Sequence, residues 1–364
     1  MTVWGTVRSA EGLCPQAKES LRPFCFEMDR NESDVDCAKT QNKEKCRREK
    51  NQFCMQDTGK ADLNKSEEKN MNLYAPKYYK KFKCIADKCK NSCCVGWEID
   101  IDKATLIKYQ ALKSAYGTRI MDSICLDDTP HFKLKKGDRC PHLDENGLCK
   151  IIINEGESYL CDICREHPRF YNYTGDCEVG LGMSCEEAAR IILSSSEYDE
   201  MEYIGENQMD PDNIEFDGRL ERQKIYKILK DESATYTRRL EKIYRQYGLD
   251  FDNDSEYLEI LKSLEYLDPS HKGLFLNYSS KQRPNDSEEY LERFLAYFIY
   301  RHATEAFDYE DFCTRLTFCM FCERLFASLI HKTEAKELNE VVNLAIIISS
   351  EIEYSEDNTF ELMI

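Results

Sequence analysis

The chain has 364 residues, a net charge of -18 at pH 7 and a pI near 5.0. This balance lacks the extended basic surface that nucleic-acid phosphates require, so we expect no nucleic-acid partner. A cationic partner such as a lysine side chain suits the charge, although acidity that only keeps the chain soluble is the simpler interpretation. We find no secretory signal and no apolar run of about 18 residues. We therefore expect a cytoplasmic protein without a membrane partner.

The 19 cysteines are concentrated in one part of the chain: five precede residue 60, eleven lie between Cys84 and Cys185, and three between Cys313 and Cys322. In the cytoplasm thiols stay reduced, and dense cysteine there is more often metal-binding or catalytic than disulfide-forming. We therefore predict that the stretch from Cys84 to Cys185 binds metal. A set of structural disulfides is the alternative that the missing export signal disfavours.

The composition predicts four segments along the chain. Residues 1–70 form a cysteine-containing extension that ends in the polar linker DTGKADLNKSEEKN, and their function stays open. Residues 71–195 form the cysteine-rich metal-binding domain, and 219–364 form a helical domain. Between these two, residues 196–218 are strongly acidic, which favours a solvated linker over an acidic substrate groove.

Local patterns predict the first secondary-structure elements in chain order. Asp102 caps a helix that runs to Tyr116 and stops at Gly117. Residues 140–153, CPHLDENGLCKIII, form a β-hairpin around the Asn146-Gly147 dipeptide, which favours a type I′ turn. This hairpin brings Cys140 and Cys149 together.

Later in the chain, helical patterns dominate. Ser184 and Glu187 form a capping box, so that Cys185 lies in the first turn of a helix. In SEEYLERFLAYFIYRH the apolar residues follow the spacing of one buried helix face: Leu291, Phe294, Leu295, Phe298 and Ile299. Cys313, Cys319 and Cys322 are predicted to be core thiols. The predicted fold is therefore mainly α, with an irregular cysteine-rich domain that contains a short β-hairpin, followed by a helical C-terminal domain.

Four groups of thiols make up the predicted metal region. The candidate ligands are Cys84, Cys89, Cys93, Cys94, Cys140, Cys149, Cys161, Cys164 and Cys185. Zinc suits a closed site of four thiolates, for which the hairpin and the CDIC motif supply Cys140, Cys149, Cys161 and Cys164. An iron-sulfur cluster also takes four thiolates and accepts irregular spacings. Spacing alone leaves zinc and iron-sulfur level. Cys125 and Cys177 are expected to be bystanders.

Three further residues carry two interpretations each. At a helix N-terminus Cys185 gains a lowered pKa and becomes a ready ligand or nucleophile, unless it is a buried apolar thiol. His167 can be a ligand or a packing residue. Arg169 can hold a carboxylate through two parallel hydrogen bonds or lie on the surface. No Walker A, GxSxG, HExxH or dinucleotide-binding motif is present.

The cysteine motifs resemble those of the flagellin lysine-N-methylase family. The matching motifs are F-x-C-x4-C-x3-C-C-x-G-W at residues 82–97, C-P-x-L-x3-G-L-C at 140–149, C-x2-C-x3-P-R at 161–169 and S-C-x-E-A-A-R at 184–190. The match runs from about residue 71 to 195, and more loosely to the C-terminus. Two departures, His167 for an aromatic residue and Glu186 for a proline, change no candidate ligand.

This resemblance implies methyl transfer from S-adenosylmethionine to lysine ε-amines of flagellin, with a [4Fe-4S] cluster in the site. Zinc stays the alternative metal that the cysteine spacing allows. Under this reading, Glu98, Asp100 or Asp102 receives the amine proton or steers the cation, and Gly96, Trp97 and Arg169 contact the donor. The competing interpretations are a non-catalytic zinc- or iron-binding module that recognises a protein partner or delivers metal, and a redox protein.

Overall fold

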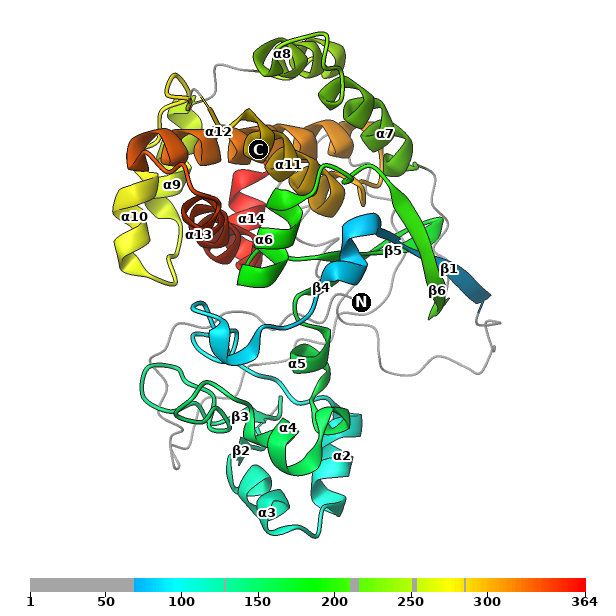
Figure 1. The fold of residues 1–364 in the computed structure, drawn as a ribbon, viewed down its shortest axis with the longest axis vertical. Helices are drawn as coiled ribbons and strands as arrows, with labels where there is room; N and C mark the ends of the chain where they lie inside the picture. The colour runs from blue at the N-terminus through cyan, green and yellow to red at the C-terminus, as the bar shows by residue number, and fades with distance from the viewer. Residues whose placement is uncertain (1–68, 128, 210–215, 251–253, 285) are drawn as a thin grey trace, which may run out of the picture. The chain divides into compact units, whose positions relative to one another are not determined.

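The computed structural model describes residues 69–127, 129–209, 216–250, 254–284 and 286–364 (Figure 1). The extension predicted for residues 1–70 lies outside these residues apart from its last two. Helices predominate, as predicted, but a four-stranded sheet makes this a mixed α/β fold rather than a mainly α one.

The sheet joins strands that are far apart in the sequence. Its order is β4-β5-β1-β6, with β1 parallel to β5 and antiparallel to β6, and with β4 antiparallel to β5. The four strands are β1 (Lys69–Pro76), β4 (Arg169–Thr174), β5 (Asp176–Leu181) and β6 (Met201–Met209). Gly175, at φ +86°, makes the tight turn between β4 and β5.

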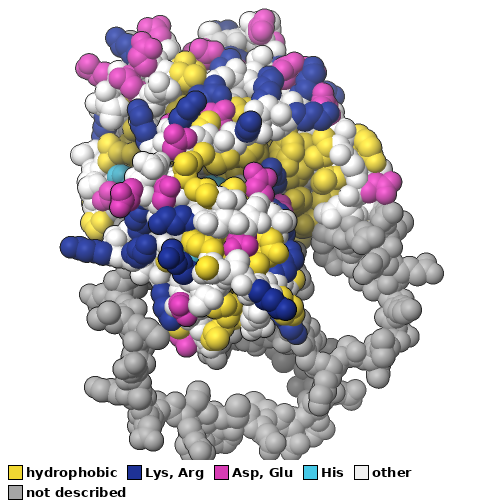
Figure 2. Space-filling view, turned by 60° about the horizontal axis from the view of Figure 1, so that its bottom comes forward, with side chains coloured by type: hydrophobic (Ala, Val, Ile, Leu, Met, Phe, Trp, Pro, Cys, Tyr) yellow, Lys and Arg dark blue, Asp and Glu magenta, His cyan; other side chains and the backbone are white. Residues whose placement is uncertain are grey.

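Strand β6 corrects the predicted acidic linker. Residues 201–209 pair with the whole length of β1, so this part of residues 196–218 is sheet edge and not a solvated connection. Lysines that follow β1 pair with acidic side chains just before and within the start of β6: Lys77 Nζ lies 3.0 Å from Glu197 and 2.8 Å from Glu200, and Lys80 Nζ lies 2.7 Å from Glu202. Basic and acidic side chains are likewise interspersed on the face drawn in Figure 2.

The cysteine-rich segment consists of short elements around a small core. In chain order these are the 3₁₀ turns η2 (Lys77–Lys81) and η3 (Ala86–Lys88), α2 (Lys103–Ala111), α3 (Ala115–Asp122), β2 (Ile124–Cys125), β3 (His131–Phe132), α4 (Lys150–Glu155), the 3₁₀ turn η4 (Glu157–Tyr159) and α5 (Asp162–Glu166). The buried core residues are Ile99, Ile101, Tyr109, Ile120, Ile124, Phe132, Cys140, Leu143, Ile151 and Cys161.

Two local predictions in this segment are partly wrong. Asp102 caps α2, accepting the Thr105 N–H at 2.8 Å, but the helix ends at Ala111, and Gly117 lies inside α3, which Ser114 caps. The short hairpin is β2-β3, upstream of the predicted position.

The turn predicted at Asn146-Gly147 exists without a hairpin. Leu143 and Cys149 form one antiparallel bridge, and the Asp144 carboxylate accepts the N–H groups of Asn146 and Leu148. Only Gly147 has a positive φ, +81°, so the turn is not type I′, which requires positive φ at both residues. The apolar run that follows Cys149 is the helix α4 instead of a strand.

The remaining helices enclose the larger core. They are α6 (Glu186–Ser194), α7 (Gly218–Leu229), α8 (Tyr236–Tyr247), α9 (Asp254–Ser263), α10 (Pro269–Phe275), α11 (Glu288–Phe298), α12 (Tyr309–Thr333), α13 (Leu338–Ile348) and α14 (Glu356–Leu362). Two π-helical turns continue α11 and α13: η5 (Ile299–Ala303) and η6 (Ser349–Glu353). No described helix has the length and apolarity that a membrane span needs.

The predicted apolar face of α11 is confirmed. Leu291, Phe294, Leu295, Phe298 and Ile299 are all buried in the larger core. Cys319 and Cys322 are buried there too, and Cys313 packs against its edge, so these three are core thiols as predicted. The core also receives α6, so the helix that follows the last cysteine motif packs with the C-terminal helices.

Candidate functional site

The first cysteine motif forms an irregular loop that is fastened to the start of α6. Cys84 and Cys93 are exposed, and Cys89 and Cys94 are half-buried. The Glu186 carboxylate accepts the backbone N–H groups of Lys90 at 2.7 Å and Asn91 at 3.3 Å. Because Glu186 directly follows Cys185, these bonds hold the loop against Cys185.

The cysteines that flank the Asp144 turn and those of the CDIC motif gather elsewhere, in the small core. The Cys140 N–H donates to the Cys94 carbonyl at 2.8 Å, and the Cys164 N–H donates to the Cys161 carbonyl at 3.0 Å. Cys140 and Cys161 are buried in that core, and Cys94, Cys149 and Cys164 pack against it. The adjacent residues Cys93 and Cys94 therefore lie between two groups of thiols.

Mutual electrostatic effects among the thiols follow the same division for Cys140 and Cys89, whereas the adjacent Cys93 and Cys94 side chains interact with each other across it. Burial raises the pKa of Cys140 to about 12, and the neighbouring Cys94 and Cys149 thiols add to this pKa shift. Burial also raises the pKa of Cys89 to about 12, with further contributions from Glu186 and Cys185. These thiols are thus protonated at neutral pH in the metal-free chain, and metal binding has to release their protons.

Cys185 differs from its predicted place in the helix, and its pKa favours the buried-thiol alternative. It is the N-cap of α6, and no side chain caps this helix, so the predicted Ser184–Glu187 capping box does not form. Glu187 instead pairs with Arg190. Burial raises the pKa of Cys185 above its ordinary value, and this outweighs the lowering by the N–H groups of Glu187 and Ala188. The helix N-terminus alone therefore does not make Cys185 a thiolate.

The donor chemistry of these residues suits a thiophilic metal, because every member of both groups is a reduced cysteine. Within the residues that the structure describes, no three Cys, His, Asp or Glu side chains already converge in a coordinating arrangement. The thiols are therefore neighbours whose side chains have to reorient around an ion or cluster.

The three predicted carboxylates differ in their environments. Asp102 has both oxygens occupied, by the N–H groups of Thr105 and of Asp162 at 2.9 Å, so it fastens the starts of α2 and α5. Burial opposes ionisation of Asp102, yet these backbone bonds lower its pKa overall. Asp100 is half-buried, and burial together with the Glu98 charge raises its pKa. Glu98 lies 3.8 Å from His131. Of the three, Asp100 has the environment that suits a proton acceptor.

Arg169 is held by aromatic and carbonyl groups. Its Nε donates to the Tyr79 hydroxyl at 2.8 Å and its Nη1 to the Arg165 carbonyl at 3.1 Å, and its guanidinium lies within 6 Å of the Tyr79 and Phe82 ring centres. No carboxylate among the described residues lies within ion-pair distance of Arg169. Because Phe82 opens the first cysteine motif, this guanidinium borders the loop.

Trp97 packs against a buried polar network that the sequence reasoning missed. Its ring lies 4.9 Å from the Tyr354 ring, edge to face, and the His167 ring lies 6.4 Å from Tyr354. The Arg301 guanidinium lies 5.2 Å from the same Tyr354 ring. Gly96, at φ +84°, supplies the turn before Trp97. The first cysteine motif and the C-terminal helices therefore meet at Tyr354.

The two π-helical turns supply the charged centre of this network. Arg301 of η5 lies 3.3 Å from the Glu353 carboxylate of η6, and His302 lies 2.7 Å from it. The Tyr297 hydroxyl donates to Glu353 and accepts N–H groups from Arg301 at 2.9 Å and from Met183 at 3.1 Å. Burial opposes ionisation of Glu353, but Arg301 and His302 lower its pKa overall. Such π-turns often mark functional sites.

One sequence signal pointed to this network. Tyr297 and Phe298 lie on the buried face of α11, and four residues on stand Arg301 and His302, which continue the same face with charged side chains. Buried charges need partners, so this pattern predicts an acidic residue nearby. It does not say which one.

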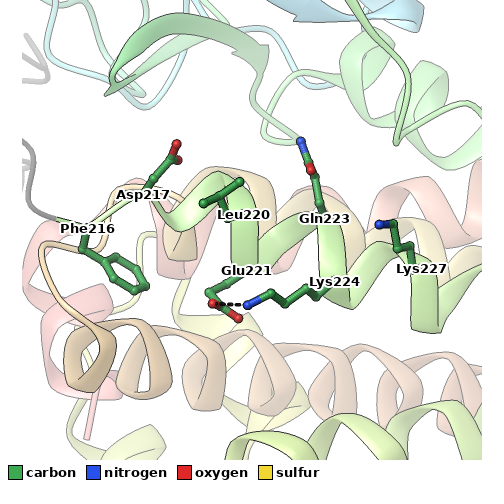
Figure 3. Close-up of a pocket in the computed structure, with 7 residues that line it drawn as sticks. All are labelled: Phe216, Asp217, Leu220, Glu221, Gln223, Lys224 and Lys227. Carbon is green, nitrogen blue, oxygen red and sulfur yellow. Dashed lines mark hydrogen bonds and ion pairs between the residues drawn. The ribbon is translucent and has the colours of Figure 1, made fainter.

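A hollow of about 340 Å³ lies elsewhere, along the start of α7 (Figure 3). It is lined by Phe216, Asp217, Leu220, Glu221, Gln223, Lys224 and Lys227. It is open to solvent, and Glu221 and Lys224, one turn apart on α7, pair with each other at 2.6 Å. None of the predicted site residues lines it, so it is not the candidate site.

Comparisons with known proteins agree with the cysteine motifs. Over 134 residues, 35% of this chain, it is 32% identical to the "Flagellar biosynthetic protein FliU" of Salmonella muenchen, 79% of which is covered. Over the same length it is 32% identical to the "Lysine-N-methylase" of Salmonella choleraesuis and 31% identical to that of Salmonella typhimurium. The matched region spans a third of each of these methylases. No family model matches the chain, and no solved structure matches it.

The fold and site thus define a mixed α/β protein with a thiol-rich loop packed against a buried charged network. The chain belongs to the family of FliU and the lysine-N-methylases.

Proposed function

We propose that this protein transfers methyl groups from S-adenosylmethionine to lysine ε-amines of flagellin, with an iron-sulfur cluster bound by its cysteines. The observation that carries the proposal is the likeness to proteins named for lysine methylation and for flagellar biosynthesis. The reduced thiols of the loop and the small core include the candidate ligands for such a cluster. When bound, the cluster supplies a metal centre at which polar groups of the donor can be held.

The reaction needs an uncharged amine. A free lysine has a pKa near 10.4, so only about one in 2,500 is neutral at pH 7. The amine nitrogen forms a bond to the methyl carbon as the carbon–sulfur bond breaks, and the sulfur keeps the electron pair as a thioether. The amine proton passes to a base. Asp100 fits this role, because a raised pKa makes its carboxylate a stronger base than an exposed aspartate.

The donor needs one anionic and one aromatic contact. Its carboxylate suits Arg169, whose guanidinium is fixed in place and has no described carboxylate partner. Its sulfonium and adenine groups suit an aromatic surface, which Trp97 offers beside the first cysteine motif. The net charge of -18 favours approach of the cationic lysine.

Formation of S-adenosylhomocysteine tests this proposal. Anaerobically purified protein with its native metal should form it from the donor only when flagellin is present. Asp100→Asn should lower kcat by roughly 100-fold, the lower range for loss of a positioned base, whereas Glu98→Gln should leave kcat within about twofold. Arg169→Lys should raise the KM for the donor with a smaller change in kcat, because it removes a paired contact. Flagellin-independent turnover, or no turnover with full metal content, would contradict the proposal.

A further inference from the structure

The nine candidate ligands fall into two sets that different parts of the fold hold. The outer set is Cys84, Cys89, Cys93 and Cys185; the inner set is Cys94, Cys140, Cys149, Cys161 and Cys164. Three members of the outer set lie in the loop that Glu186 fastens to α6. The fourth, Cys185, is the N-cap of α6, which packs in the larger core. The inner set belongs to the small core. The sequence alone did not separate them, because Cys93 and Cys94 are adjacent yet belong to different sets.

The two sets differ in access to solvent. In the outer set Cys84 and Cys93 are exposed, and Cys89 and Cys185 are half-buried. In the inner set Cys140 and Cys161 are 6% and 1% exposed, and the others are half-buried. Closed, tetrahedral sites of four thiolates hold structural zinc, whereas a metal centre that meets a substrate keeps an open side. The inner set has the character of the first kind and the outer set that of the second.

The inner set is also placed where a structural ion is needed. Cys140 precedes the Asp144 turn and Cys149 follows it, while Cys161 and Cys164 open α5, so four thiols come from the ends of two short elements. Only ten buried residues make up this core. A core of this size contributes limited stability on its own, and small cores are often supplemented by a metal or a disulfide. Each inner cysteine is a free thiol.

We propose that the chain has two metal sites: a structural zinc site built from Cys140, Cys149, Cys161 and Cys164, and a separate cluster site built from Cys84, Cys89, Cys93 and Cys185. Cys94 lies beside the zinc site, where its carbonyl accepts the Cys140 N–H. The assignment of iron-sulfur to the outer set rests on the proposed function, whereas the division into two sites does not.

Metal analysis of the full chain, purified without oxygen, tests the division. We expect about one zinc per chain together with about four iron and four sulfide. Cys89→Ser should remove iron, sulfide and the visible absorbance band, and zinc should stay. Cys161→Ser should remove zinc and lower the urea midpoint, and the band should stay. Cys177→Ser is the matched control: this thiol is buried in β5, outside both sets, and its loss should change neither metal.

If Cys161→Ser fails to fold, the test uses the unaltered chain with cobalt substituted for zinc. Its visible spectrum should then report tetrahedral thiolate ligands while the iron content stays unchanged. A chain that holds only one metal centre, or loss of the same band in both the Cys89 and Cys161 variants, would overturn the proposal. These readouts do not depend on methyl transfer, so an inactive protein with both metals would contradict the proposed function alone.

Discussion

Glu353 is the residue on which the buried charged network depends. Its carboxylate is the shared partner of Arg301, His302 and Tyr297, all buried or nearly so. Glu353→Gln leaves the Arg301 charge buried without its counter-ion, and we expect this to lower the free energy of unfolding by about 3 kcal/mol. Urea denaturation followed by circular dichroism measures it.

An exposed pair provides the control for this prediction. Glu259 also pairs with a cation, Lys262 at 2.5 Å, but its side chain is 74% exposed. Glu259→Gln should change the free energy of unfolding by less than about 0.5 kcal/mol, because water screens surface pairs. Equal effects of the two substitutions would show that burial does not govern the Glu353 network.

His302 makes stability depend on pH. Burial lowers its pKa below the ordinary value despite the Glu353 carboxylate beside it. As the pH falls through about 6.5, His302 becomes protonated in the unfolded chain but stays neutral in the folded chain. Its contribution to the stability of the folded state is therefore complete above this pH and is lost as the pH falls below it. Between pH 6.5 and 5 the free energy of unfolding should fall less steeply in His302→Gln than in the unaltered protein, by up to about 1.4 kcal/mol per pH unit. A variant with the unchanged slope would contradict this.

At the scale of elements, the strand-to-helix link between β5 and α6 leaves no room at Gly182. A Cβ there would lie 2.7 Å from the Tyr354 hydroxyl, 2.8 Å from an Arg301 nitrogen and 3.2 Å from the Pro168 carbonyl. Gly182→Ala should displace Tyr354 or Arg301 and lower the free energy of unfolding by about 2 kcal/mol. It should also shift the fluorescence of Trp97, which packs on Tyr354.

The matched control is a glycine with open space around it. Gly273 lies inside α10, and a Cβ at this position meets nothing within 4 Å. Gly273→Ala should leave Trp97 fluorescence unchanged and should stabilise the protein by up to about 1 kcal/mol, because alanine is the better helix former. A fluorescence shift in both variants would argue against a specific contact at Gly182.

The sequence predicted the elements whose signals are local. The buried face of α11 and the Asp102 cap of α2 follow from spacing and from side-chain chemistry within one turn. The sheet was missed because β1 pairs with β5 and β6, more than 100 residues away. Residues 150–153 were assigned to a strand of the predicted hairpin because a short apolar run suits a buried strand or a helix equally well, and they lie in the helix α4.

The candidate site, too, was predicted only where its signals are local in the sequence. Motif spacing gave nine candidate cysteines, and their packing in the structure separates them into two sets. The charged network was missed because Arg301 and Glu353 are about 50 residues apart, and each alone looks like part of a helix surface. Asp102 fitted a catalytic role from its position, but hydrogen bonds to two helix starts occupy it.

At the scale of the whole molecule, the two cores should respond differently to metal removal. The small core has ten buried residues and many thiols, whereas the larger core contains most of the buried aromatic side chains. Chelation of both metals should therefore unfold residues 94–164 and leave α11 to α13 protected. Hydrogen exchange read by mass spectrometry checks this, with the metal-loaded protein as reference. Equal loss of protection in both regions would contradict two separately stabilised cores.

The central claim is that this chain methylates lysine. The most direct measurement uses anaerobically purified protein, flagellin and a donor whose methyl group carries deuterium, followed by peptide mass spectrometry. We predict labelled methyl groups on flagellin lysines and on no other residue type, and their absence in the Cys89→Ser variant. Unlabelled flagellin in the presence of protein that carries its full complement of iron and zinc would contradict the account.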